Sequence, residues 1–104
     1  MTQVDLNPPT FQVLTTEIIP FTVEWQDLVG IGNTVSVPFG ILYDNTNGIA
    51  ATGGFVGNFG ANGTQAQYIL DGSKLQLGHT YTGIVSVVSN GQTFKNRIIV
   101  SVPR

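Results

Sequence analysis

Few side chains in this sequence could do acid–base or nucleophilic chemistry. The chain has one histidine, His79, together with six carboxylates and no cysteine. A catalytic triad needs a histidine beside a serine and a carboxylate, but His79 follows Gly78 in a polar stretch, so we expect a solvent-facing turn residue. Glu24 and Asp27 are three residues apart at a predicted strand end, which points them to opposite faces. No carboxylate pair is spaced for acid–base work, and the sequence predicts no catalytic residues and no enzyme.

The sequence also gives little support for a metal site or a phosphate-binding site. A calcium site at Asp44, Asn45 and Asn47 would contain one carboxylate, which is too few without ligands from elsewhere. Asp44 is instead predicted to hydrogen-bond nearby backbone in a turn. The glycine-containing stretches 30–33 and 53–63 lead into no predicted helix, unlike phosphate-binding loops. We therefore expect no metal and no cofactor.

The charge content narrows the range of partners. Only 10% of the 104 residues are charged, against about 25% in an average domain, and the formal net charge is −2. Four Lys and Arg residues are too few for a phosphate-binding surface, so nucleic acid is not expected as a partner. No apolar run approaches the ~20 residues that span a bilayer, and residues 1–5 lack the start of a signal peptide. We expect no membrane partner.

The elements that must position any site are predicted to be strands. Valine and isoleucine contribute 21 residues, and β-branched side chains suit a pleated surface, while 13 glycines interrupt every candidate helix. Alternation of apolar and polar residues predicts strands at 21–26, 35–41, 64–70, 80–89 and 92–102, and a further short one near 49–52.

Two of these strands allow their faces to be assigned. On the first strand, Trp25 shares a face with Phe21 and is expected to be the core aromatic. On the second, Pro38 cannot donate a ladder hydrogen bond, which predicts an edge strand or a bulge. The inward face of that second strand is expected to consist of Val35, Val37, Phe39 and Ile41.

The last third of the chain carries the clearest pattern. Asn90 and Gly91 form a two-residue turn of the type that joins antiparallel strands, because both residues tolerate positive φ. Tyr81 opens the preceding strand and is placed to return its hydroxyl to backbone a few residues upstream, as in a tyrosine corner. The chain is thus predicted to be an all-β, immunoglobulin-like sandwich of about seven strands, residues 16–104, preceded by an extended arm, residues 1–15.

Four pieces of the sequence follow one order: an aromatic–acidic strand, a Gly/Asn loop, a Tyr-initiated hairpin with an Asn-Gly turn, and an Arg-hydrophobic last strand. These pieces are 23–27, 30–33, 81–93 and 97–102. Over residues 21–102 the chain resembles small immunoglobulin-like structural proteins of tailed bacteriophages. The resemblance implies a virion protein assembled in the host cytoplasm, most of all a capsid cement or decoration protein present in many copies. The alternative within this class is a tail or fiber-tail adaptor.

The partners that this resemblance implies are the major capsid protein or tail proteins, with further copies of the chain. Two segments, 1–10 and 53–63, lie outside the predicted strands and are candidate contacts with such partners. Phe55 and its apolar neighbours in the glycine-rich segment either form an interface or pack internally. Residues 1–10 are expected to become ordered only on the partner. The candidate interface residues are Val4, Leu6, Pro8, Pro9, Phe11, Phe55, Val56 and Phe59.

A carbohydrate-binding module is the alternative from another class. β-Sandwiches can present aromatic side chains to sugars, and the aromatic residues available for this role are Tyr43, Phe55, Phe59 and Tyr68.

Overall fold

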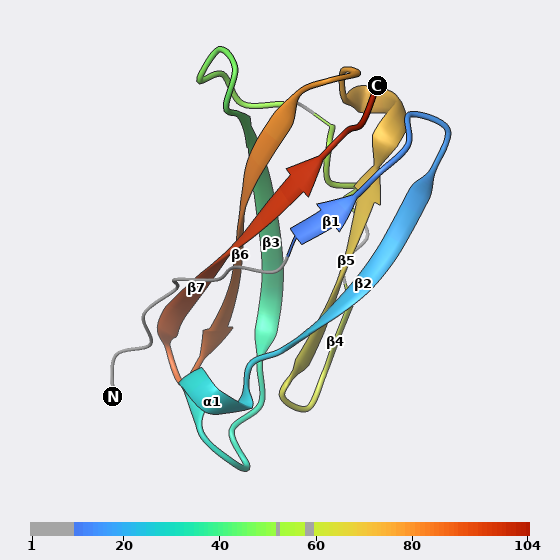
Figure 1. The fold of residues 1–104 in the computed structure, drawn as a ribbon. Helices are drawn as coiled ribbons and strands as arrows, with labels where there is room; N and C mark the ends of the chain where they lie inside the picture. The colour runs from blue at the N-terminus through green and yellow to red at the C-terminus, as the bar shows by residue number, and fades with distance from the viewer. Residues whose placement is uncertain (1–9, 52, 58–59) are drawn as a thin grey trace.

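The computed structural model of the chain describes residues 10–51, 53–57 and 60–104, which form two packed β-sheets (Figure 1). One sheet has the strand order β1-β7-β6-β3, with bounds Thr10–Gln12, Gln92–Ser101, Thr80–Ser89 and Ser36–Asp44. The other has the order β2-β5-β4, with bounds Ile18–Glu24, Gln65–Asp71 and Gly60–Asn62. Neighbouring strands pair antiparallel except β1 and β7, which run parallel. The chain is therefore an all-β, immunoglobulin-like sandwich, as predicted.

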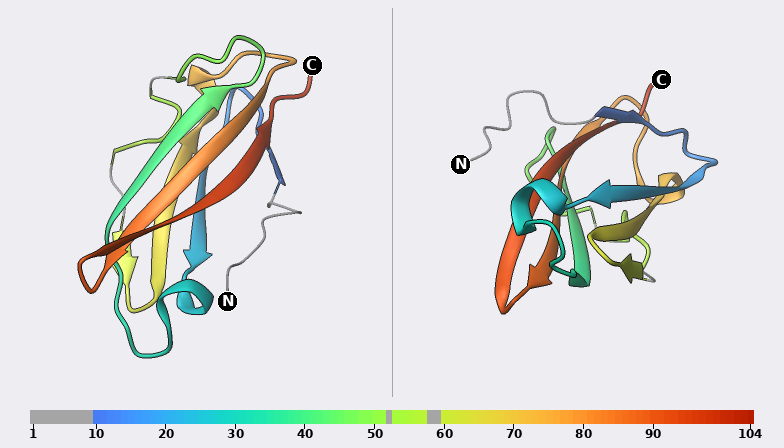
Figure 2. Two further views of the ribbon diagram at one scale, coloured as in Figure 1. Left: turned by 90° about the vertical axis from the view of Figure 1, so that its left-hand side faces the viewer. Right: turned by 90° about the horizontal axis from the view of Figure 1, so that it is seen from below.

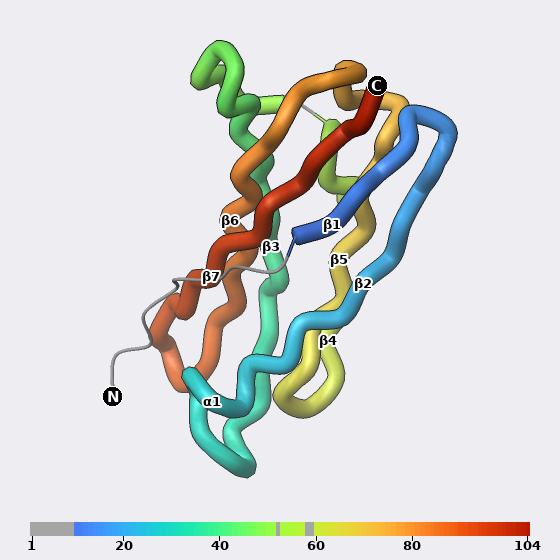
Figure 3. The backbone as a smooth tube through the Cα atoms, viewed as in Figure 1, coloured from blue at the N-terminus to red at the C-terminus, as the bar shows by residue number. Residues whose placement is uncertain are grey.

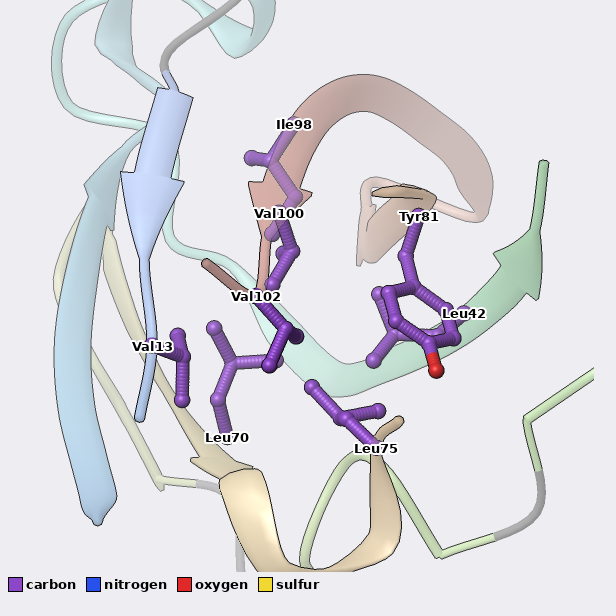
Figure 4. Close-up of a cluster of buried hydrophobic side chains, with 8 residues drawn as sticks. All are labelled: Val13, Leu42, Leu70, Leu75, Tyr81, Ile98, Val100 and Val102. Atoms are coloured by element: carbon purple, nitrogen blue, oxygen red, sulfur yellow. The ribbon is translucent and has the colours of Figure 1, made fainter. Parts of the chain in front are cut away.

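The two sheets enclose an apolar core with a cluster toward each end. Trp25 and Tyr68 lie in one cluster, and Tyr81 lies in the other; each exposes at most 1% of its surface. Phe21 and Phe55 pack against both clusters and connect them. Burial of this kind contributes about 25 cal/mol per Å² of apolar surface. Figure 4 shows one cluster, whose members are Val13, Leu42, Leu70, Leu75, Tyr81, Ile98, Val100 and Val102.

The hairpin and the tyrosine corner form as predicted. Asn90 and Gly91 have φ values of 51° and 75°, and the strands on either side pair in register from Ser89 with Gln92 onward. The Tyr81 hydroxyl accepts a hydrogen bond of 2.8 Å from the backbone N–H of Gln76, five residues upstream. This contact fixes the loop that leads into β6.

The predicted inward face of β3 is wrong beyond Val35. The register of β3 against β6 shifts between Ser36 and Phe39, and Val37 in between has a φ of 49°. The irregularity changes the alternation of the strand, so Leu42 is buried while Phe39 is 57% exposed. β3 is also an edge strand, so both features that Pro38 predicted, an edge and a bulge, are present.

Several segment boundaries differ from the predicted ones. β1 pairs with β7 and is followed by Val13, which is fully buried, so the sandwich begins by residue 10 rather than 16. The predicted strand near 49–52 reduces to a bridge between Tyr43 and Ala50. The glycine-rich segment, expected to lie outside the sheets, contributes β4 and a bridge from Phe55 to Leu70.

Two short helical turns connect strands at the ends of the sandwich. The turn α1 (Gln26–Val29) follows β2, and the 3₁₀ turn η1 (Gly72–Lys74) follows β5. Figure 3 shows these two turns at opposite ends of the molecule.

Candidate functional site

The outward side of the four-stranded sheet, called the outer face here, carries several exposed and half-exposed apolar side chains. Residues directly opposite one another on paired strands share a face, so Phe39, Ile41 and Tyr43 of β3 lie beside Ser86, Ile84 and Thr82 of β6. Phe39 is 57% exposed and Tyr43 is 40% exposed. On β7, Ile99 lies opposite Thr82. The left view of Figure 2 looks onto this sheet, with β2 and β5 behind it.

The outer face carries positive charge and no carboxylate from its strands. Arg97 lies opposite Ile84, and Lys95 lies opposite Ser86, so both cations belong to this face. The one acidic residue in the four strands is Asp44, which pairs with the buried Tyr81 and is itself only 5% exposed. The face is therefore apolar and cationic on a chain whose formal net charge is −2.

Phe39 and Ile41 of the outer face were missed in the sequence because β3 was placed in the wrong phase. A signal was present: β6 and β7 have apolar residues at adjacent positions, such as Ile84 with Val85 and Ile98 with Ile99. A strand with one solvated face shows alternation, whereas apolar residues on both faces indicate that both are covered or contact a partner.

His79 is not the solvent-facing turn residue that the sequence predicts. Its Nδ1 lies 2.7 Å from Oδ2 of Asp44, and the side chains are 23% and 6% exposed respectively. A carboxylate only accepts, so the shared proton belongs to Nδ1. Asn45 adds two hydrogen bonds between the turn after β3 and the start of β6. Its N–H donates to the carbonyl of Thr80, and its Oδ1 accepts from the Thr82 hydroxyl. The pair holds the turn after β3 against the loop before β6.

Each oxygen of the Asp44 carboxylate accepts a hydrogen bond. Burial raises its pKa, but hydrogen bonds from His79 and from the N–H of Thr46 outweigh that effect and hold the pKa below its ordinary value. The side-chain oxygen of Asn47 accepts from the N–H of Ile49. The side-chain oxygens of the three residues considered for calcium therefore face donors, and among the described residues no group of three His, Cys, Asp or Glu side chains could hold a metal ion.

Of the predicted interface residues, the structure describes Phe11, Phe55 and Val56. Phe11 is half-buried and its ring centroid lies 4.8 Å from that of Phe21, while half-buried Phe55 packs under Gly40. The half-buried Val56 donates its N–H to the carbonyl of Ile69. Phe11 and Phe55 thus pack internally against the core. Outside the described residues lie Val4, Leu6, Pro8, Pro9 and Phe59.

The aromatic set considered for sugar binding is also divided. Tyr68 is fully buried and donates its hydroxyl hydrogen to the carbonyl of Ser86, while Phe55 packs against the core. Of the set's described members, Tyr43 is the one on the surface. The structure does not bring Tyr43, Phe55 and Tyr68 together into a sugar platform, and Phe59 lies outside the described residues.

No protein-family model matches the chain, and no curated protein sequence matches it. Among solved structures the fold is similar to part of the twitchin kinase region from C. elegans (Fn31-NL-kin-CRD-Ig26), at 12% sequence identity and a TM-score of 0.46. The match covers 91% of this chain and 15% of that chain. In residues 10–51, 53–57 and 60–104, no helix is long and apolar enough to cross a membrane.

Proposed function

We propose that this chain is a non-enzymatic structural protein that docks onto another protein through its outer face. The observation that supports this most directly is the exposure of Phe39 and Tyr43 beside Ile41 and Ile84 on one sheet face. Exposed apolar side chains gathered on one surface of a small domain mark an interaction site. The open outer side of a sheet suits a protein surface better than a small molecule, which binds in concave sites.

The setting that we propose is a bacteriophage virion, with the chain as a capsid cement or decoration protein. The resemblance of residues 21–102 to immunoglobulin-like phage structural proteins supports this setting. Many copies can lie side by side because only 10% of the residues are charged, which keeps repulsion between neighbours small. A stable contact with the major capsid protein buries about 1,000 Å² or more in total.

The first test is the composition of purified virions of the phage that encodes the chain. Quantitative mass spectrometry is expected to find the protein at a copy number comparable to that of the major capsid protein. A copy number of a small fraction of that value would assign the chain to the tail or a fiber adaptor. Virions that lack the chain altogether would refute the virion proposal.

The second test separates docking from folding. Replacing Phe39 and Tyr43 with serine should abolish binding of the purified protein to particles that lack it, while changing the free energy of unfolding by about 0.5 kcal/mol or less per site. Ile31 is 85% exposed and lies outside the strands of the outer face, so Ile31→Ser is the matched control and should bind normally. Normal particle binding by the double variant would exclude the outer face as the docking surface.

A further inference from the structure

The outward side of the three-stranded sheet is polar and hollowed, in contrast to the outer face. Register places Thr22, Gln67 and Gly60 in one row across the sheet, and Glu24, Gln65 and Asn62 in the next. Because Gly60 has no side chain, the first row ends in a gap. A hollow of about 260 Å³ lies there, lined by Thr22, Gly60, Ala61, Asn62, Gln65, Ala66 and Gln67.

The polar side chains of this hollow are mostly available to a ligand. No hydrogen bond from the side chain of Thr22, Asn62 or Gln67 to another described residue is present, and Gln65 makes one long contact of 3.4 Å to Oε1 of Glu24. Each amide offers a carbonyl oxygen that accepts and an NH₂ group that donates two hydrogens. The hollow therefore presents paired donors and acceptors without a charged group in its lining.

The surrounding charge favours a neutral ligand. Glu24 lies in the second row beside Gln65, and its pKa is lowered, first by the hydrogen bond from the Thr64 side chain. It is thus an anion at neutral pH and repels anionic groups. Among the described residues that line the hollow there is no lysine or arginine to compensate for that repulsion.

We propose that this hollow is a binding site for a neutral oligosaccharide. Neighbouring hydroxyls of a sugar both donate and accept, which matches the amides of Gln65, Gln67 and Asn62, and the carboxylate of Glu24 accepts from a further hydroxyl. A peptide that extended the sheet would instead need a long free strand edge, whereas the hollow lies on the sheet face and β4 has three residues.

This site goes beyond the proposed function and does not depend on it. The hollow and the outer face belong to different sheets, whose inner faces pack together, so the two sites face away from each other (Figures 1 and 2). A molecule docked on a particle through the outer face would present the hollow to the surroundings.

Gly60 provides a test that fills the hollow without disturbing the fold. Its φ is not positive, and within the described part of the chain a Cβ placed on it would meet only Oε1 of Gln67, at 3.8 Å, an ordinary contact distance. Gly60→Val should therefore keep its melting temperature and lose sugar binding. A Cβ added at Gly57 would meet no atom of the described residues within 4 Å, and Gly57 does not line the hollow, so Gly57→Val is the matched control.

The experiment begins with the full-length protein on a glycan array that carries neutral, sialylated and sulfated oligosaccharides. We expect neutral glycans to be bound and acidic ones to be rejected. The best neutral glycan is then titrated by NMR, where the side-chain NH₂ signals of Gln65 and Gln67 should shift. Gln65→Ala combined with Gln67→Ala should weaken binding about tenfold, since each lost hydrogen bond costs a modest amount, and Gln92→Ala at the start of β7 should have no effect.

Three results would overturn the proposal: no neutral glycan bound at any position of the array, a preference for acidic glycans, or unchanged binding by Gly60→Val. Each can occur whether or not the outer face docks onto a virion, so failure here is distinguishable from failure of the proposed function.

Discussion

At the scale of single residues, Asp44 is the group most dependent on its surroundings. Its Oδ1 accepts from the N–H of Thr46 at 2.9 Å, and its Oδ2 lies 2.7 Å from Nδ1 of His79. A buried carboxylate without such donors would be costly, because its hydration is lost on folding. The two contacts thus link a turn, a loop and the end of β3.

The first prediction concerns the pH dependence of stability. The pKa of Asp44 is lower in the folded chain than its ordinary value, so its contribution is complete above the unfolded pKa, about 4, and is lost as pH falls through the folded value. Asp44→Asn should therefore flatten the decline of the melting temperature below about pH 4. Thermal unfolding from neutral to acidic pH measures this effect, with the exposed Asp27→Asn as control. Parallel pH profiles for wild type and Asp44→Asn would contradict it.

The second prediction concerns the other member of the pair. His79→Ala should lower the free energy of unfolding by about 1–3 kcal/mol, because it leaves the buried Asp44 carboxylate with one donor fewer. Chemical denaturation at pH 7 measures the change. Gln76→Ala, an exposed substitution in the same loop that keeps the backbone N–H bonded to Tyr81, should change little. Equal stability of the two variants would show that the pair is not a structural contact.

At the scale of elements, the edge strands carry features that limit further pairing. Pro20 lies in β2 and Pro38 lies in β3, and each of these strands is at the edge of its sheet. Proline lacks the N–H that an incoming strand would use. β3 also carries its bulge next to Pro38, and Ala51 covers part of its edge by donating to the carbonyl of Leu42. Contact through a sheet face is thus favoured over contact through an edge.

The third prediction concerns the β3 bulge. Val37 is β-branched and has a φ of 49°, a region that L-residues occupy at a cost of about 1–2 kcal/mol. Its side chain is 68% exposed, so Val37→Gly loses little burial and should raise the free energy of unfolding by up to about 1 kcal/mol. Val88→Gly, at a regular strand position in β6, should instead lower the free energy of unfolding. Destabilisation by Val37→Gly would mean that the residue is not strained.

At the scale of the whole molecule, the N-terminal end of the sandwich closes the core. Phe11 packs on Phe21, and Val13 is fully buried and donates its N–H to the carbonyl of Ser101. Removal of residues 1–13 should therefore expose the core and lower the free energy of unfolding. Loss of one large buried side chain costs about 2–5 kcal/mol, and loss of both side chains costs more. Removal of residues 1–9 deletes none of these contacts and is the control. Equal melting temperatures for the two truncations would show that β1 is dispensable.

The sequence by itself determined the features that depend on neighbours along the chain. Alternation placed Trp25 inside and put Tyr68 on one face with Leu70. The pair Asn90 and Gly91 predicted a turn, and the position of Tyr81 predicted its contact with upstream backbone. These features could be predicted because strand periodicity, turn conformation and a loop closing over five residues are local properties.

The tertiary structure alone decided where the candidate sites lie. The bulge at Val37 reverses the alternation of β3. Pro38 indicated an edge or a bulge but did not fix the phase of the strand beyond it, so Phe39 and Tyr43 were recognised on the outer face only from the register with β6. Asp44 and His79 are 35 residues apart and meet because that same register brings them together. The hollow beside Gly60 likewise exists because β2, β5 and β4 align their polar rows. Contacts between distant residues depend on strand pairing, which one-dimensional periodicity does not specify.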